Sequence, residues 1–331
     1  MRSYMRVILN FNYFPANRRL VVEIQLGHGR GMTTSLSPAE ARKGVLFALA
    51  CYGSWGLFPA FWRLLAELPP ADVLAWRIVW SLLAVLILVG WQRRWNDVLV
   101  LLGSRRRLAV LAASTACISV NWLVFIAAVG GGKVLEASMG YFLNPLVNVA
   151  LGVVVLKERL RSLQWLAVAL AVAGVVQLTA VTGSPPWVAL ILAVTFGIYG
   201  LLRKRLPVAP LIGLAVETGL MLPFAVAWLA WRVLAGGAPM LGGSVELALI
   251  LAASGPVTAL PLLWFAAAAT RMRYASLGFF QYMAPTGHFL LAVLAYGETP
   301  EPAHWLTFAC IWVAILLYSA DVWRQYRLSA A

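Results

Sequence analysis

Charged side chains are scarce in this sequence: Asp, Glu, Lys and Arg make up 11% of its 331 residues, whereas soluble domains contain roughly 25%. A chain that is 62% hydrophobic cannot cover its surface with polar groups in water, so a lipid bilayer is its predicted partner. Cysteine is also rare, because only Cys51, Cys117 and Cys310 occur, with no CxxC or Cys/His cluster. This excludes a disulfide framework and a structural zinc site, and we expect no metal or other cofactor.

Long apolar runs dominate instead, each of about 20 residues, which is the length of a helix that crosses a hydrocarbon core of about 30 Å. Helix is the favoured spanning form because each backbone group then bonds within its own segment. Continuous runs such as Leu82–Val89 exclude the alternation of a β-barrel strand. We therefore predict an all-α integral membrane protein with ten transmembrane helices, at 44–62, 73–91, 108–129, 134–156, 163–181, 186–202, 210–231, 247–269, 275–297 and 303–320.

Basic residues are the exception to the scarcity of charge, since the formal net charge is +14. In a soluble protein this charge would suggest nucleic acid. Here most of the 26 lysines and arginines fall in alternate connections and at the two ends of the chain, and the opposite connections hold only Arg63, Lys133 and Arg232. The positive-inside rule then places both termini in the cytoplasm, which requires an even number of helices in the inner (cytoplasmic) membrane. No nucleic-acid partner is expected.

The chain repeats itself at an offset of about 140 residues. Pro145 is followed thirteen residues later by Glu158, and Pro285 is followed at the same spacing by Glu298. Five helices per copy is an odd number, so the second copy is predicted to enter the membrane from the opposite face, as in many secondary transporters. The predicted parts are a cytoplasmic N-terminal extension, two inverted five-helix repeats and a cytoplasmic tail, at 1–42, 43–181, 186–320 and 321–331.

Residues 1–31 are polar and aromatic with scattered arginines, and they carry no evident signal peptide. Met32 precedes a short polar stretch and then the first span. We expect 1–31 to be ill-ordered or a misassigned extension, and the sequence leaves open whether Met1 or Met32 is the true start.

Four separate stretches have a distinctive sequence, at residues 119–125, 135–149, 200–207 and 278–286. They resemble the RarD group, in the EamA branch of the drug/metabolite transporter superfamily. The resemblance covers residues 42–325 and leaves 1–31 outside. It implies an inner-membrane permease of ten helices with cytoplasmic termini, in agreement with the charge pattern.

Ionisable groups inside the membrane are costly and mark candidate sites. Arg77 lies roughly 9 Å into the second span, and the alternative to a functional role is that it extends to the outer headgroups. Glu217 is its equivalent in the second copy, and inversion separates the two in depth by about 10 Å. We predict that Arg77 pairs with Glu136 or with a substrate anion, and that Glu217 is a proton- or cation-linked carboxylate, with a purely structural role for Glu217 left open.

Polar groups near two prolines, Pro145 and Pro285, form the second candidate group. A proline in mid-span removes a helix bond and is expected to kink the helix, and paired kinks between repeats suit a central binding site. The alternatives are ordinary helix packing and interhelical hydrogen bonds. The candidate residues in the two proline-containing spans are Tyr141, Asn144, Asn148, Gln281, Tyr282 and His288. Asn121 and Trp122 of the third span are expected to face the same cavity, and Trp122 and Trp264 to line a pocket for a flat or apolar solute, with ordinary core packing as the alternative.

The predicted function is secondary transport of a small organic metabolite or drug-like solute by alternating access. The alternatives are a channel, a lipid-handling membrane protein or an intramembrane enzyme. No catalytic motif such as HExxH or GxSxG and no nucleotide-binding loop is present in the sequence, which weighs against an enzyme and against ATP-driven transport. Substrate, direction and coupling ion stay open, with a proton or cation as candidate coupling ion and a homodimer as candidate assembly.

Overall fold

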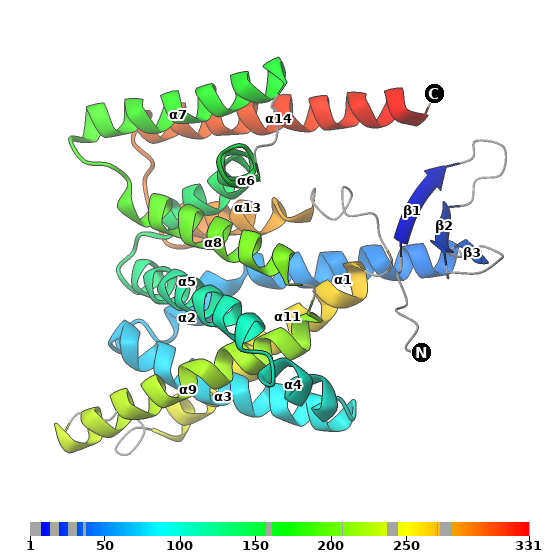
Figure 1. Cartoon of the computed structure of the whole chain (residues 1–331). Helices are drawn as coiled ribbons and strands as arrows, with labels where there is room; N and C mark the ends of the chain where they lie inside the picture. Colours follow the sequence, from blue (N-terminus) through cyan, green and yellow to red (C-terminus); the bar gives the residue numbers. More distant parts are fainter. Residues whose placement is uncertain are drawn as a thin grey trace.

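The structure, a computed structural model, describes residues 8–13, 20–25, 32–35, 38–156, 161–206, 208–236, 244–269, 271 and 280–330. From Pro38 onward the described chain is helical, as predicted, and short turns join the helices (Figure 1). The elements are α1 Pro38–Gly56, α2 Phe58–Arg63, α3 Pro70–Trp91, α4 Trp95–Leu102, α5 Arg105–Gly130, α6 Val134–Leu156, α7 Ser162–Thr182, α8 Trp187–Arg205, α9 Pro210–Leu234, α11 Val245–Ala269, α13 Met283–Leu290, the π-helix η1 Leu291–Ala295 and α14 Pro302–Ala330.

Proline and glycine set many of the helix boundaries. Pro70, Pro210 and Pro302 are the first residues of α3, α9 and α14, where a missing N–H costs no hydrogen bond. Gly183 follows α7 with a φ of 74°, a left-handed conformation that glycine adopts without steric penalty. These signals were readable in the sequence, so most predicted spans agree with the helices within a few residues.

The N-terminal extension adds three strands that we did not predict. Strands β1 Ile8–Tyr13, β2 Leu20–Gln25 and β3 Met32–Ser35 form an antiparallel sheet in the order β1-β2-β3. Apolar and polar residues alternate from Leu9 to Tyr13, which is the period of a strand. The prediction for residues 1–31 overlooked this short alternation.

Seven helices of the described chain are long and apolar enough to cross a membrane. They lie at Arg42–Arg63, Pro70–Trp91, Arg105–Gly130, Ser162–Thr182, Pro210–Leu234, Val245–Phe265 and Pro302–Asp321. Two shorter apolar helices are Trp187–Arg203 and Met283–Ala295. The chain is therefore a multi-pass membrane protein. The first part of the predicted span 275–297 lies outside the described residues.

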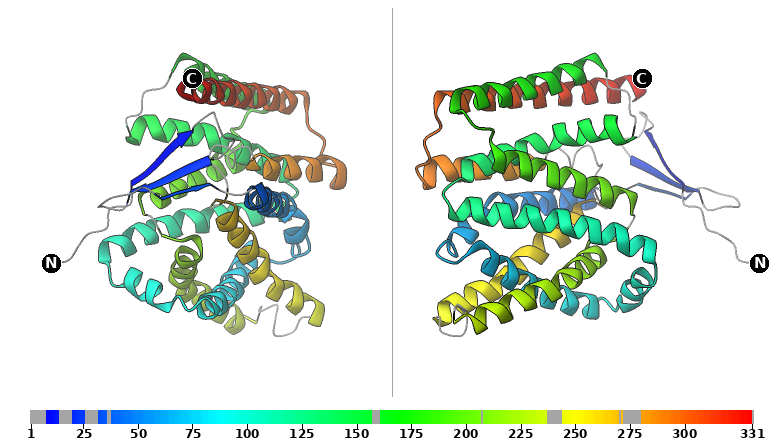
Figure 2. Two further views of the ribbon diagram at one scale, coloured as in Figure 1. Left: turned by 90° about the vertical axis from the view of Figure 1, so that its right-hand side faces the viewer. Right: turned by 60° about the vertical axis from the view of Figure 1, so that its left-hand side comes forward.

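Helices from the two ends of the chain pack against one another. Helix α3 contacts α9 and α11, α5 contacts α8 and α9, and α6 contacts α8 and α13. Helix α1 contacts α11 and α13, and α7 lies along α14 at the top of the views in Figures 1 and 2. The largest buried apolar cluster includes Phe142, Leu192 and Phe308 from α6, α8 and α14. Side chains of the first five predicted spans thus find their packing partners mainly in the last five.

Candidate functional site

Arg77 is enclosed by three other helices. Its guanidinium carbon Cζ lies 3.9 Å from the ring centroid of Trp122 on α5 and 4.6 Å from that of Trp62 on α2. Its Nε donates a hydrogen bond of 3.2 Å to the Thr258 hydroxyl on α11, and the residue is only 2% exposed. Arg77 therefore points into the helix bundle, and the alternative that it extends to the lipid headgroups is wrong.

Glu136 does not pair with Arg77, so that part of the prediction is wrong. The Glu136 carboxylate accepts a hydrogen bond of 3.0 Å from the backbone N–H of Val188, in the first turn of α8. The first N–H groups of a helix have no partner within the helix, and they attract a carboxylate. Depth in the membrane suggested Arg77 as the partner, but the start of α8 satisfies Glu136 instead.

Glu217 on α9 is also buried, at 2% exposed. The hydroxyl of Ser114 on α5 donates to its Oε1 at 2.7 Å, and the hydroxyl of Tyr199 on α8 donates to its Oε2 at 3.4 Å. Nη1 of Arg203, near the end of α8, lies 3.8 Å from Oε1. A Cβ at Gly213, one turn earlier on α9, would collide with the Arg203 guanidinium. Because residue 213 is glycine, the guanidinium of Arg203 has room to approach the Glu217 carboxylate.

Arg203 is a site residue that sequence reasoning missed. It belongs to the basic run Arg203-Lys204-Arg205, which was interpreted only as a topology signal. A second signal was present, since Arg203 follows Arg63 at the 140-residue offset of the repeat and so occupies an equivalent place in the second copy.

The structure brings three of the predicted polar residues together. Asn121 Nδ2 donates to the Leu192 carbonyl at 2.9 Å, and the Tyr141 hydroxyl donates to Asn121 Oδ1 at 3.2 Å. The ring of His288 lies 5.4 Å from that of Tyr141. His288 Nε2 is 2.9 Å from the carbonyl of Trp55, which fixes the proton on Nε2 because a carbonyl only accepts. Helices α5, α6 and α13 thus form one polar and aromatic cluster.

The structure describes the helix that contains Pro285, one of the two prolines of the predicted kinks. Helix α13 begins at Met283, so Pro285 lies in its first turn, where no intrahelical bond is lost. Phe280 is helical, and Gln281 and Tyr282 form a turn one helical turn ahead of Pro285. Residues 272–279 lie outside the described residues, so a kink of the predicted span at Pro285 stays a prediction. The Pro285 carbonyl accepts a hydrogen bond of 2.8 Å from the Ser138 hydroxyl, which links α6 to α13. Helix α6 includes position 145, and a kink there stays a prediction.

The remaining predicted residues are not brought into contact with Arg77 or Glu217 by any interaction in the described chain. Asn144 is buried, and its Oδ1 has no partner among the described residues. Trp264, Gln281 and Tyr282 are half-buried. The side chain of Asn148, like that of Pro145, lies outside the described residues. Roles for these residues stay predictions.

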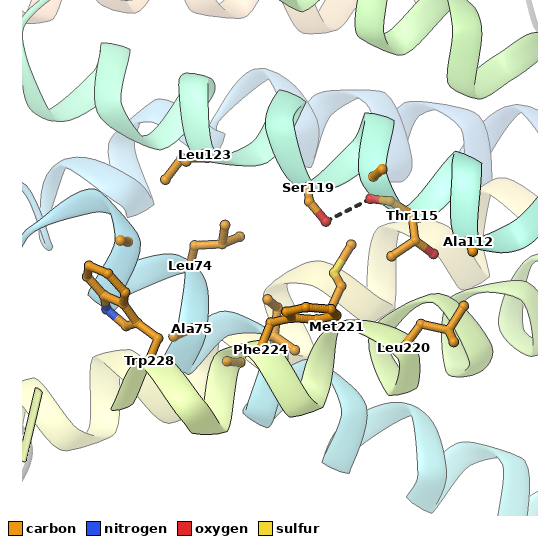
Figure 3. Close-up of a pocket in the computed structure, with 14 residues that line it drawn as sticks. Leu74, Ala75, Ala112, Thr115, Ser119, Leu123, Leu220, Met221, Phe224 and Trp228 are labelled. Carbon is orange, nitrogen blue, oxygen red and sulfur yellow. Dashed lines mark hydrogen bonds between the residues drawn. The ribbon is translucent and has the colours of Figure 1, made fainter. Parts of the chain in front are cut away.

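A pocket of about 480 Å³ lies between α3, α5 and α9. Figure 3 shows Leu74, Leu123 and Phe224 projecting toward it from these three helices. The hydroxyl-bearing residues in its lining are Thr115 and Ser119, and Ser119 donates to the Thr115 carbonyl at 2.7 Å. None of the predicted site residues lines this pocket. Its apolar residues resemble those of any membrane helix, so the sequence held no signal for it.

A buried ion pair joins α3 to α9 beside one end of this pocket. Asp72 is fully buried and lies 3.0 Å from Nη2 of Arg232. It also accepts a hydrogen bond of 2.8 Å from Trp228 Nε1, and Trp228 lines the pocket. Asp72 is in the first turn of α3 and Arg232 in the last turn of α9, the positions where helix dipoles favour an acid and a base.

Other ion pairs connect helix ends elsewhere. Arg161, just before α7, pairs with Asp321 on α14 at 2.8 Å. Arg271, just after α11, pairs with Glu40 on α1 at 2.9 Å. Hydrogen bonds from Lys43 and then Arg271 hold the pKa of the Glu40 carboxyl below its ordinary value. Helices distant in sequence are thus tied together by charge as well as by apolar packing.

Comparison with known proteins adds independent information. Residues 42–180 match the model of the EamA-like transporter family. The chain is 47% identical to an uncharacterized transporter of Pseudomonas aeruginosa, over 88% of this chain and 98% of that protein. It is 44% identical to the RarD protein of Escherichia coli and 42% identical to an uncharacterized transporter of Bacillus subtilis, each over 88% of this chain and 98% of the relative. One crystal structure shares the fold, with a TM-score of 0.52 and 19% identity over 84% of this chain and 97% of that one.

Proposed function

Because the chain belongs to the RarD group of the EamA-like transporters, in the drug/metabolite transporter superfamily, we propose that it moves a small organic solute across the cytoplasmic membrane by alternating access. It is a membrane transporter by family.

The proposed architecture has ten transmembrane helices in two inverted repeats, with both termini in the cytoplasm. The seven long apolar helices become ten when α6, α8 and the α13–η1 segment are included. Helix pairing supports the repeat, because α3 packs on α9, α6 on α13 and α7 on α14, which are pairs of equivalents. Helix α8 is the equivalent of α1, and α5 is the equivalent of α11. In keeping with this, α1 packs on α11 and α8 packs on α5. Exchanging the two copies therefore leaves the pattern of contacts largely unchanged.

The observation that carries the proposal is the setting of the two buried charges. Arg77 on α3 bonds the Thr258 hydroxyl on α11, and Glu217 on α9 bonds the Ser114 hydroxyl on α5. In the proposed repeat α3 is equivalent to α9, and α11 to α5. Each charge is therefore held by the third span of the other copy. Ionisable groups held between repeats are typical of substrate and ion pathways in transporters.

In this mechanism Arg77 binds an anionic group of the solute, and Glu217 exchanges a proton or cation. The cluster of Asn121, Tyr141 and His288 lies close to Trp122, which follows Asn121 in sequence and stacks on Arg77. It supplies hydrogen bonds and aromatic surface along the same path. Rocking of one repeat against the other then exposes the solute to each side in turn.

Flux in proteoliposomes tests the proposal. A comparison of metabolites inside and outside cells that lack or overproduce the protein first identifies solutes whose distribution depends on it. We expect the purified protein to catalyse saturable counterflow of such a solute. Flux that does not saturate would indicate a channel, transfer confined to labelled lipids would indicate a lipid-handling protein, and chemical turnover without flux would indicate an enzyme.

Glu217→Gln tests the coupling role. The substitution keeps the shape and one acceptor oxygen, which can still accept from the Ser114 hydroxyl, while an amide NH2 group replaces the oxygen that accepts from Tyr199. It removes the titratable charge. We expect net transport to fall about tenfold or more, because proton transfer or cation binding at this position is lost, and the residual rate to be independent of pH. Glu246→Gln on the exposed start of α11 is the matched control and should leave the pH profile unchanged. An unaltered pH profile in Glu217→Gln contradicts the coupling role.

A further inference from the structure

The charge of Arg77 has no acidic partner in the part of the chain that the structure describes. Each ion pair found there joins other residues, including Arg203 to Glu217 and Arg232 to Asp72. Arg203 and Arg232 each have a carboxylate partner, whereas the more deeply enclosed guanidinium of Arg77 has none among the described residues. Such an uncompensated charge is unfavourable for the protein alone and marks a position for an external counter-charge.

The unused hydrogen-bond donors of Arg77 indicate the shape of the missing partner. Nε is bonded to Thr258, and the two Nη groups have no partner among the described residues. Trp62 and Trp122 present their ring faces to the cation, so they stabilise its charge but accept no N–H in the guanidinium plane. Two parallel N–H groups in that plane match a carboxylate or another planar pair of oxygens.

The surroundings limit the charge and the polarity of this partner. The nearest arginine in sequence, Arg63, donates to the Val129 carbonyl and stacks on Tyr296, so it is engaged elsewhere. A dianion bound by Arg77 alone would keep an unpaired charge. Trp122 packs against the apolar cluster that contains Ile78, Ile118 and Met221. A ligand that reaches Arg77 therefore places its remaining atoms against apolar and aromatic side chains.

We propose that Arg77 binds the carboxylate of a monoanionic solute with an apolar body, held beside Trp62 and Trp122. This names the substrate class of the transport function proposed above and rests on it. A phospholipid phosphodiester is also a monoanion, but Arg77 is enclosed by α2, α5 and α11. Purification in a detergent that contains no phosphate distinguishes a bound solute carboxylate from a bound phospholipid.

Thermal unfolding of the full-length protein in dodecyl maltoside tests this inference with benzoate and its neutral isostere benzamide. A ligand that binds only the folded state raises the midpoint temperature. We expect benzoate to raise it in a saturable manner and benzamide to have no effect. Arg77→Gln should weaken benzoate binding by at least about tenfold, because a charge-assisted bidentate contact is lost, and Arg77→Lys should be intermediate. Arg63→Gln, which removes an exposed guanidinium nearby, is the matched control and should bind as the wild type does.

Several results would overturn the inference. If the wild type responds equally to benzoate and benzamide, or to neither, there is no carboxylate site, whatever the variants show. If Arg77→Gln binds benzoate as tightly as Arg63→Gln, the site lies elsewhere. Should Arg77→Gln fail to fold, Arg77→Lys and the comparison of the two ligands still decide the question. Benzoate binding without counterflow in proteoliposomes would refute the transport proposal and keep the site, whereas counterflow of neutral solutes without benzoate binding would do the reverse.

Discussion

Replacing Arg232 with glutamine is expected to lower the free energy of unfolding by about 3 kcal/mol. Asp72 is fully buried, and Arg232 supplies its only positive partner among the described residues. Without Arg232 the carboxylate keeps the hydrogen bond from Trp228 but remains as a buried charge without compensation. The value is placed at the low end of the range for such pairs because Arg232 is partly exposed. The free energy of unfolding is measured in mixed micelles of increasing SDS content, with circular dichroism as the signal.

The double variant Asp72→Asn/Arg232→Gln is the control for this prediction. It removes both charges and retains groups that can bond Trp228, so we expect it to be more stable than Arg232→Gln alone. The difference in a double-mutant cycle gives the coupling between the two side chains. Additive destabilisation in the double variant would show that the pair is not coupled and that α3 and α9 are held together by apolar contacts.

Gly255→Ala is expected to cost about 2–3 kcal/mol, because overpacking between rigid helices forces backbone shifts. Gly255 on α11 faces the backbone of α3. A Cβ at this position would collide with the Trp80 carbonyl oxygen and lie 2.7 Å from its carbonyl carbon. Backbone atoms cannot move aside as a side chain can, so the two helices must separate. The same SDS unfolding assay applies.

The matched control is a glycine at which an added Cβ would meet no other atom. Gly219 also lies inside a membrane helix, α9, but a Cβ there meets nothing within 4 Å. Gly219→Ala should be neutral or stabilising by about 0.5–1 kcal/mol, since alanine favours helix over glycine. Gly255→Ala should also weaken benzoate binding, because Thr258 is one turn further along α11 and would move away from Arg77. Similar stability of the two alanine variants would mean that α3 and α11 do not pack as closely as the structure has them.

Sequence reasoning predicted part of the candidate site. It selected Asn121, Tyr141 and His288 as polar residues within apolar spans, and the structure places them in one cluster. It also selected Arg77 and Glu217, both of which are buried, and predicted that inversion separates them in depth by about 10 Å. These residues were recognisable because a polar group in an apolar run stands out whatever surrounds it.

The residues that sequence reasoning missed lie near helix ends. Asp72, Arg203 and Arg232 fall where charged residues are common in any membrane protein, so they were counted for topology or left without a role. Glu136 was assigned to the wrong partner for a related reason. Depth in the membrane can be estimated from sequence, but the direction in which a side chain leaves its helix depends on how that helix is rotated against its neighbours.

By itself the sequence determined that this protein is a multi-pass helical membrane protein and a member of the RarD group. Hydrophobicity and family motifs are read along the chain, so they need no knowledge of packing. Only the tertiary structure decided that Arg77 lies against two tryptophans rather than against Glu136, and that Asp72 joins Arg232 across α3 and α9. Those contacts depend on close approaches such as that of Gly255 to Trp80, which fix the rotation of one helix against another and leave no trace in the hydropathy of either.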